Sequence, residues 1–287
     1  MKTISDILPF FLSELQVFYR ENEIKSFAYI SIKHILNMSK SDTIIHSKKI
    51  LEEDQILRIK SSISSLKEYE PIQYIFNETE FYKREFYCMY GALIPRPETE
   101  ELVDWIIRDN KETKKNYLDV GTGSGCIIIS LCNNLKGNFT GIDVSRDALR
   151  VAISNNDRNE TNVNFECVDV LNYEEDFSVS NLNDKYDVIV SNPPYVLNSE
   201  KEQMQKNVLD WEPHIALFVE DDDSFIFYNR IADRASKILN KKGLLYFEIN
   251  ERFGKEIIEL LEKKGFVNIE LKKDINDKDR MIKAMWK

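Results

Sequence analysis

The sequence predicts an α/β protein in which a small N-terminal helical domain precedes a Rossmann-like domain with a doubly wound, seven-stranded sheet. Two observations predict this fold. Strand and helix patterns alternate from about residue 95 onward, as parallel strands joined by crossover helices require. Before that point, residues 1 to about 75 repeat apolar positions at helical spacing and contain no glycine. We expect a helical domain over 1–75, a β-hairpin linker over 76–95, and the sheet domain over 96–287.

The N-terminal elements are expected from periodicity. The helical pattern runs through three segments, residues 7–20, 26–36 and 48–69. Residues 80–94, "EFYKREFYCMYGALI", change to aromatic and β-prone side chains, which is typical of a hairpin or a linker strand pair.

The strands of the second domain are expected at seven apolar segments, 116–120, 139–144, 163–169, 186–192, 243–250, 266–273 and 280–287. Helical patterns separate the first five, so these strands should be parallel. Only "DINDKD" joins the last two, which is too short for a crossover helix and predicts an antiparallel pair. A parallel sheet that ends in an antiparallel hairpin is not the usual layout of a dinucleotide-dependent dehydrogenase.

Composition limits the possible partners and compartments. The formal net charge of −10 and the pI of about 5.1 argue against tight non-specific binding of nucleic acid, which depends on lysine and arginine. No segment is long and apolar enough to span a membrane, and Asp6 and Glu14 argue against a secretory or organellar leader. The cysteines lack metal-ligand spacing, so we expect no metal and a reducing, cytoplasmic setting: they are Cys88, Cys126, Cys132 and Cys167.

A glycine turn follows the first strand of the sheet domain in "YLDVGTGSGCIII" (117–129). Gly121, Gly123 and Gly125 let a ligand approach the backbone, and the helix that follows offers N–H groups. Cys126 stands where a pyrophosphate-binding fingerprint needs its third glycine. The preceding acid, Asp119, suits a ligand with a cationic amino group and no phosphate. S-adenosyl-methionine is such a ligand, and the alternative is a tight turn without a ligand.

Two aspartates end the next strands. Asp143 follows roughly 20 residues after the glycine turn, where a carboxylate accepts hydrogen bonds from ribose hydroxyls. Asp169 closes the third strand and, at the carboxyl edge of the sheet, can reach an adenine amino group. A solvated aspartate at a strand end is the alternative for Asp169.

The motif "SNPPYV" (191–196) ends the fourth strand in a stiff elbow. The side-chain oxygen of Asn192 and the carbonyl of Pro193 are two convergent acceptors that suit an –NH₂ group, and Tyr195 supplies a flat wall and a hydroxyl. An amino group held in this way can present its nitrogen to an electrophilic methyl. An ordinary turn would explain the prolines alone.

The segment "LIPRPETEELV" (93–103) predicts a helix that begins at Pro97, with acidic residues in its first turn where the helix dipole favours them. These acidic residues are Glu98, Glu100 and Glu101. The local pattern does not explain Arg96, which lies between two prolines.

Taken in order, "LIPRPETE", "DVGTGSG", "IDVSRDAL", "SNPPYV", "WEPHIAL" and "KDINDKDR" resemble the protein-glutamine N(5)-methyltransferase family over residues 70 to 287. The resemblance implies a class I S-adenosyl-methionine-dependent methyltransferase domain. It implies cofactor contacts at Gly121, Thr122, Gly123, Ser124, Gly125, Asp143, Asp169, Val170 and Asn192. By the same resemblance, the substrate amide would be held by Asn192, Pro193, Pro194 and Tyr195, of which Asn192, Pro193 and Tyr195 would be catalytic. The N-terminal helices would recognise the protein substrate. Asn77 and Asn250 stand where the family usually has glycine.

The sequence therefore predicts methyl transfer from S-adenosyl-methionine to the side-chain nitrogen of the glutamine in the Gly-Gly-Gln motif of peptide-chain release factors. The alternatives are methylation of a ribosomal-protein glutamine, methylation of a nucleic-acid amino group, or a catalytically silent binding module. The net charge of −10 counts against a nucleic-acid acceptor, and the complete "GTGSG" and "NPPY" motifs count against a silent module.

Overall fold

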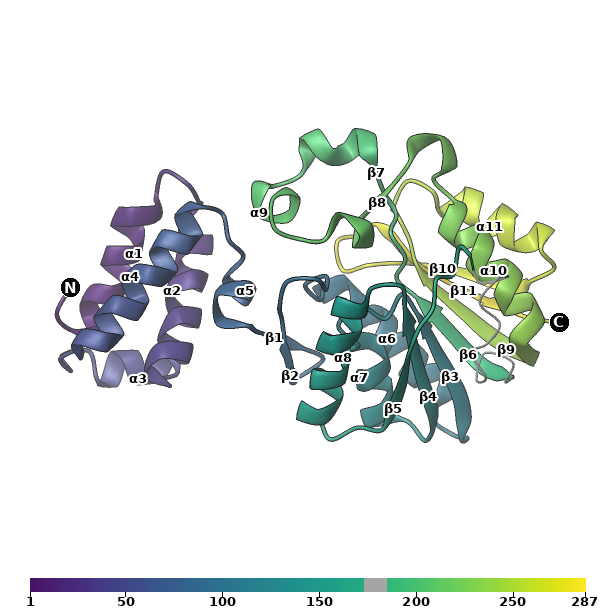
Figure 1. The fold of residues 1–287 in the computed structure, drawn as a ribbon, viewed down its shortest axis with the longest axis horizontal. Helices are drawn as coiled ribbons and strands as arrows, with labels where there is room; N and C mark the ends of the chain where they lie inside the picture. The colour runs from purple at the N-terminus through teal and green to yellow at the C-terminus, as the bar shows by residue number, and fades with distance from the viewer. Residues whose placement is uncertain (173–184) are drawn as a thin grey trace. The chain divides into compact units, whose positions relative to one another are not determined.

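A computed structural model describes residues 1–172 and 185–287 of the chain, which forms two compact units (Figure 1). Unit 1 contains Met1–Asn77 together with Gln205–Trp211. Unit 2 contains Glu78–Met204 and Glu212–Lys287. No helix within the described residues is long and apolar enough to cross a membrane.

Unit 1 is helical, as the sequence predicts. Its helices are α1 (Ile7–Leu15), α2 (Glu21–Leu36), α3 (Lys40–Ile45), α4 (Glu53–Lys67), α5 (Ile72–Phe76) and the later α9 (Lys206–Leu209), with a 3₁₀ turn at Ile4–Asp6. Apolar side chains at helical spacing form its core, including Phe11, Ile32 and Leu66. Asn77 ends α5 in the left-handed conformation (φ 53°), which asparagine adopts more readily than other side chains and which explains its place at a glycine position.

A distant segment of the chain completes unit 1. The indole Nε1 of Trp211 donates to the carbonyl of Glu68 (3.0 Å), 143 positions away in the sequence. The ammonium of Lys206 lies 5.1 Å from the centre of the Tyr69 ring. The sequence pattern gave no indication of this return of the chain.

Unit 2 begins with an antiparallel hairpin of β1 (Glu78–Phe81) and β2 (Arg84–Tyr87). Tyr82 and Lys83 both have positive φ, as a two-residue turn of type I′ requires. Phe81 and Phe86 are buried in the core of this unit.

The sheet of unit 2 has seven strands in the order β10-β11-β9-β6-β3-β4-β5. These strands are β3 (Lys115–Val120), β4 (Gly137–Asp143), β5 (Val163–Cys167), β6 (Tyr186–Ser191), β9 (Leu239–Glu248), β10 (Val267–Lys273) and β11 (Asp279–Met285). The first five are parallel, and β10 pairs with β11 in the antiparallel sense, as the sequence predicts. Because β11 lies between β9 and β10, it is the one antiparallel strand of this sheet.

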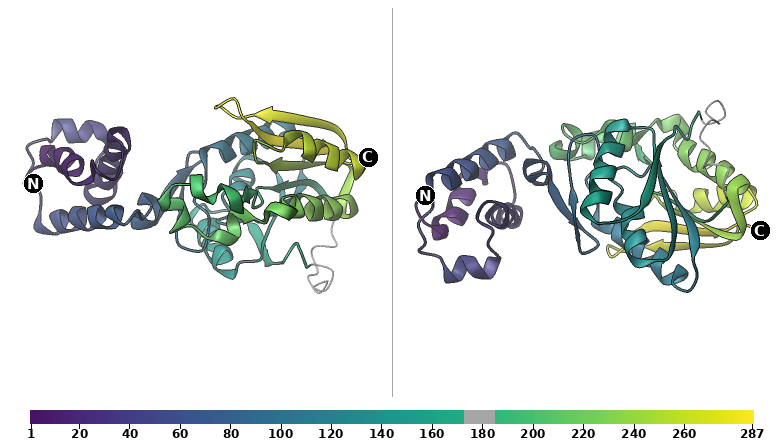
Figure 2. Two further views of the ribbon diagram at one scale, coloured as in Figure 1. Left: turned by 90° about the horizontal axis from the view of Figure 1, so that it is seen from above. Right: turned by 60° about the horizontal axis from the view of Figure 1, so that its bottom comes forward.

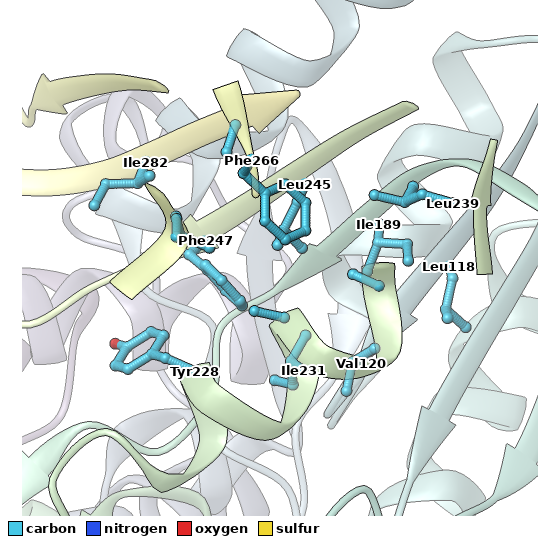
Figure 3. Close-up of a cluster of buried hydrophobic side chains, with 14 of the residues drawn as sticks. Leu118, Val120, Ile189, Tyr228, Ile231, Leu239, Leu245, Phe247, Phe266 and Ile282 are labelled. Carbon is cyan, nitrogen blue, oxygen red and sulfur yellow. The ribbon is translucent and has the colours of Figure 1, made fainter. Parts of the chain in front are cut away.

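Helices cover both faces of the sheet (Figures 1 and 2). They are α6 (Pro97–Asn110), α7 (Cys126–Asn134) and α8 (Arg146–Arg158) on one side, and α10 (Ile226–Ile238) and α11 (Gly254–Lys263) on the other. Side chains alternate between two cores along each strand. Ile189 and Phe247 join the core against α10 and α11, which Figure 3 shows, whereas Val190 and Tyr246 join the core against α6 and α7.

The parallel strands place their carboxyl ends at one edge of the sheet, where α/β proteins bind ligands. A short parallel pair, β7 (Val196–Leu197) and β8 (Phe218–Val219), follows the end of β6. Single 3₁₀ turns lie at Asn198–Gln203, His214–Ala216 and Asp221–Asp223. The residues predicted to form the site therefore converge on this edge.

Candidate active site

A pocket opens at the carboxyl edge of the sheet, within unit 2. It encloses about 990 Å³ of empty space, including the open solvent at its mouth. Predicted site residues that line it are Gly121, Gly123, Asp143, Asp169, Val170, Asn192, Pro193 and Pro194. Those absent from its lining are Asp119, Thr122, Ser124, Gly125 and Tyr195. We call the residues predicted to contact the cofactor alone the cofactor half: Gly121, Gly123, Asp143, Asp169 and Val170. We call those predicted to hold the substrate amide the acceptor half: Asn192, Pro193 and Pro194.

The three glycines of the turn differ in what a side chain at each position would contact. All three have φ between 56° and 79°, where L side chains are strained. A Cβ at Gly121 or Gly123 would meet no atom within 4 Å, so these glycines leave the pocket wall open to a ligand. A Cβ at Gly125 would lie 2.9 Å from Ile129 Cδ1 and 3.2 Å from Ala152 Cβ. Gly125 thus allows α7 and α8 to pack.

Most backbone N–H groups of the turn itself bond to other groups of the protein. Gly121 and Thr122 both donate to the carbonyl of Ile142 at 2.9 Å, and Gly125 donates to the carbonyl of Thr122. Gly123 donates to the Oδ2 atom of Asp143 (2.8 Å). A turn that uses its donors internally is a poor cradle for phosphate and fits a ligand without phosphate groups.

Asp119 lies at the end of β3 and is fully buried behind the turn. Its Oδ2 accepts a hydrogen bond from the Thr122 hydroxyl (2.7 Å), and within the described residues its Oδ1 has no partner. Burial raises the pKa of the carboxyl to about 7. An unpaired buried oxygen of this kind is stabilised when a cationic group approaches.

The other two carboxylates line the pocket while being held by their own loops. Asp143 accepts from Gly123 and, through Oδ1, from the backbone of Ser145 (2.8 Å), and burial raises its pKa. Asp169 accepts from the backbone of Leu171 and from the Asn172 side chain, both at 2.8 Å. Each carboxylate oxygen has a further lone pair for a ligand donor.

In the acceptor half, Asn192 lies just beyond β6, whose last residue Ser191 is tied to the carbonyl of Val120 (2.6 Å). The Nδ2 atom of Asn192 donates to the Thr99 hydroxyl at 3.4 Å. Tyr195, expected to be a wall of the site, instead donates its hydroxyl to Glu248 Oε1 (3.0 Å). Its ring packs against the core that the sheet forms with α10 and α11.

Sequence reasoning missed Glu248 and Thr99. Glu248 ends β9 and is 1% exposed, and it accepts from the hydroxyls of Thr99 (2.6 Å) and Tyr195. Burial raises its pKa. A glutamate at the end of the buried strand "LLYFE" was a usable signal, because a charge there needs partners.

The structure also shows what Arg96, which lies between two prolines, contacts: a buried glutamate. Its guanidinium pairs with Glu212 Oε1 (2.7 Å), and Glu212 Oε2 accepts from the backbone of Ile94 (3.1 Å). Glu212 is only 4% exposed. The pair fixes the segment that follows Ala92 and Leu93, which both line the pocket.

Comparison with known proteins agrees with this architecture. Residues 111–287 match the family model of a methyltransferase domain, and residues 11–76 match the model of the PrmC N-terminal domain. The release factor glutamine methyltransferase of Flavobacterium psychrophilum is 46% identical, with 96% of this chain and 97% of that protein aligned. The enzyme of the same description from Bacteroides thetaiotaomicron is 40% identical over 97% of this chain and 98% of its own length.

A solved structure shares the fold alone. It is a 16S rRNA methyltransferase of T. thermophilus in complex with AdoMet and guanosine, 15% identical, with a TM-score of 0.52. The match covers 73% of this chain and 50% of that one.

Proposed function

The chain belongs to the release factor glutamine methyltransferase family, an S-adenosyl-methionine-dependent enzyme family, and we propose how its residues divide the reaction between the two halves of the pocket. The observation that carries this proposal is that Asn192 and Pro193 line the same pocket as Gly121 and Asp143. The acceptor is the side-chain amide of the glutamine in the Gly-Gly-Gln motif of a release factor.

The cofactor half fits S-adenosyl-methionine. Gly121 and Gly123 leave the wall open, the turn offers few free donors for phosphate, and Asp119 keeps an unpaired oxygen close to the turn. Asp143 has lone pairs for ribose hydroxyls, and Asp169 with Val170 borders the adenine side. When bound, the cofactor supplies an electrophilic methyl group on a sulfonium. The carboxylates Asp143 and Asp169 in the pocket wall favour this positive charge.

The acceptor half orients the glutamine. Its amide nitrogen is a poor nucleophile because the lone pair is delocalised into the carbonyl. The Asn192 Oδ1 and the Pro193 carbonyl accept the two N–H bonds of the substrate amide, which fixes the plane of the group and turns its nitrogen toward the methyl. Both acceptors also stabilise the positive charge that develops on nitrogen. The nitrogen loses one of these protons after the methyl is added.

Unit 1 is proposed to dock the release factor. Exposed large apolar side chains of this unit support that role: they are Val17, Ile44, Ile45, Ile50 and Leu57. Contacts remote from the reacting glutamine can supply energy for positioning it. Because release factors act in translation, the proposal places the enzyme in the cytoplasm.

The test is labelled methyl transfer from S-adenosyl-methionine to a purified release factor, with mass spectrometry to locate the methyl group. The matched control is the same release factor with its Gly-Gly-Gln glutamine replaced by alanine, and ribosomal proteins and RNA serve as parallel acceptors. We expect transfer to the intact release factor alone. Efficient methylation of RNA or of a ribosomal protein would overturn the substrate assignment.

A second comparison tests the docking role of unit 1. A free Gly-Gly-Gln peptide should have a much lower kcat/KM than the folded release factor, because it lacks the surface that unit 1 would contact. Equal kcat/KM for peptide and protein would remove this role.

A further inference from the structure

We propose that Glu248, acting through Thr99, fixes which way the amide of Asn192 faces, so that its oxygen and not its nitrogen meets the substrate. This inference rests on the proposed function of Asn192. Glu248 and Thr99 are positioning residues here, since neither lines the pocket.

The first step is the state of Glu248. Its carboxylate is 1% exposed and receives hydroxyl donors on both oxygens, Thr99 on Oε2 (2.6 Å) and Tyr195 on Oε1 (3.0 Å). Its backbone carbonyl accepts from the Tyr228 hydroxyl (3.2 Å). With a donor on each oxygen, the carboxylate acts as an acceptor only.

The second step counts protons at Thr99. A hydroxyl has one proton, and the Thr99 proton is used in the short bond to Glu248. Toward Asn192 the Thr99 oxygen can therefore only accept. The group of Asn192 that faces it must be a donor, and this is the Nδ2 atom, at 3.4 Å.

The third step concerns the pocket. In a planar primary amide the oxygen and nitrogen point in different directions from the same carbon. With the nitrogen turned to Thr99, the oxygen of Asn192 is left for the substrate. A reversed amide would place an –NH₂ group opposite the –NH₂ group of the glutamine, and two donors cannot bond to each other.

The arrangement also accounts for the threonine between the glutamates of "PETE". Pro97 is the first residue of α6, and Thr99 lies in its first turn with its backbone N–H bonded to the carbonyl of Arg96. The start of this helix thus presents the Thr99 hydroxyl to Glu248, 149 positions away, and to Asn192, 93 positions away.

The test uses the full-length enzyme with a release factor and measures kcat, KM for the release factor, and the Kd of S-adenosyl-methionine. Thr99→Val keeps the shape and removes the acceptor, so kcat should fall about 10- to 100-fold because Asn192 populates both orientations. The Kd of the cofactor should stay within about threefold. Thr99→Ser keeps the hydroxyl and should retain kcat within about threefold.

Tyr228→Phe is the matched control, because it removes a buried hydroxyl that also bonds to Glu248 but has no link to Asn192. It should lower the free energy of unfolding by about 1 kcal/mol and leave kcat unchanged.

A double-mutant cycle then tests whether Thr99 acts on the reaction through Asn192. In an Asn192→Ala background, Thr99→Val should lower kcat by no more than about twofold, since residues that act as a unit are non-additive.

Three results would overturn the inference: Thr99→Val with wild-type kcat, Thr99→Ser as poor as Thr99→Val, or the full Thr99→Val loss persisting in the Asn192→Ala background. The first two results compare single variants with the wild-type rate, and the third compares the double variant with Asn192→Ala. A wild-type enzyme that fails to methylate release factor would instead refute the proposed function.

Discussion

The two halves of the pocket differ in how far apart in the chain their supporting residues lie. In the cofactor half, Asp143 holds Gly123 across 20 positions, and Asp169 is held by Leu171 and Asn172 next to it. In the acceptor half, Asn192 bonds to Thr99 across 93 positions, and Thr99 to Glu248 across 149. The first half is a set of local turns on adjacent strands, whereas the second exists only after α6, β6 and β9 have packed together.

The two halves also differ in how many hydrogen-bond donors the buried carboxylate behind each half receives. Asp119, behind the cofactor half, has one hydroxyl donor and an oxygen without a partner among the described residues. Glu248, behind the acceptor half, has a donor on each oxygen. A satisfied carboxylate stabilises and orients its neighbours, while an unsatisfied one lowers stability until a cation arrives. We infer that the acceptor half is preorganised and that the cofactor half becomes complete on binding.

The largest expected effect is a loss of kcat when the acceptor half alone is disrupted. Asn192→Ala should lower kcat by roughly 10²–10³ because one preorganised acceptor is lost. The fold should remain intact and the cofactor Kd should change far less than kcat. Asn192→Asp should fail almost as badly, because it has no –NH₂ to donate to Thr99 and adds a second negative charge to the network that already contains Glu248. Single-turnover methylation and calorimetry measure both quantities, and near-normal turnover by Asn192→Ala would reduce Asn192 to a turn residue.

The second effect is a loss of cofactor affinity when the cofactor half is disrupted. Asp143→Ala should weaken the binding of S-adenosyl-methionine by roughly 1.5–3 kcal/mol, since it removes a charged acceptor and releases Gly123 and Ser145. At saturating cofactor, kcat should stay within a few-fold of wild type. The control is Asp147→Asn, which alters an exposed carboxylate paired with Arg150 on the same loop-to-helix junction. An unchanged cofactor Kd in Asp143→Ala, measured by calorimetry, would contradict the ribose assignment.

The third effect is on stability and leaves the reaction aside, and it sharpens the contrast between the two buried carboxylates. Burial raises the pKa of Asp119 from 3.8 to about 7, so the folded state binds this proton more tightly than the unfolded state. The free energy of unfolding should therefore fall as pH rises from about 4 to about 7 and level off above, by roughly 1 kcal/mol per pH unit from this group. Asp119→Asn should lack that contribution.

Urea unfolding of the cofactor-free wild type and Asp119→Asn at pH 5, 6, 7 and 8 measures the difference. We expect Asp119→Asn to gain stability relative to wild type as pH rises to about 7, and then to keep a constant advantage. Parallel pH profiles for the two proteins would show that Asp119 is ordinary and that the cofactor half holds no unsatisfied charge.

Much of the fold could be predicted because its signals are local. Helical periodicity indicated unit 1, and the alternation of strands and helices indicated the parallel strands of unit 2. The short link "DINDKD" indicated the antiparallel pairing of β10 and β11, although not the insertion of β11 between β9 and β10. Strand order depends on contacts between segments far apart, which periodicity does not contain.

Local chemistry also determined which ligand the turn suits. The glycine spacing with Asp119 before it, and the aspartate one strand later, follow from neighbouring residues whose geometry the backbone restricts. The stiff elbow at Asn192 follows in the same way from two prolines in sequence. These positions can be named from the chain alone because each motif fixes its own shape.

Only the tertiary structure decided what supports those motifs. Glu212 pairs with Arg96 across 116 positions, and Trp211 returns to Glu68 across 143. Glu248 reaches Asn192 only through Thr99, by contacts that span 149 and 93 positions. A buried carboxylate finds its donors wherever the packed helices and strands bring them, and no local pattern in the sequence encodes that meeting. The sequence by itself thus indicated the groups that we propose to touch the ligands, and the packing of the sheet and its helices decided which residues support those groups.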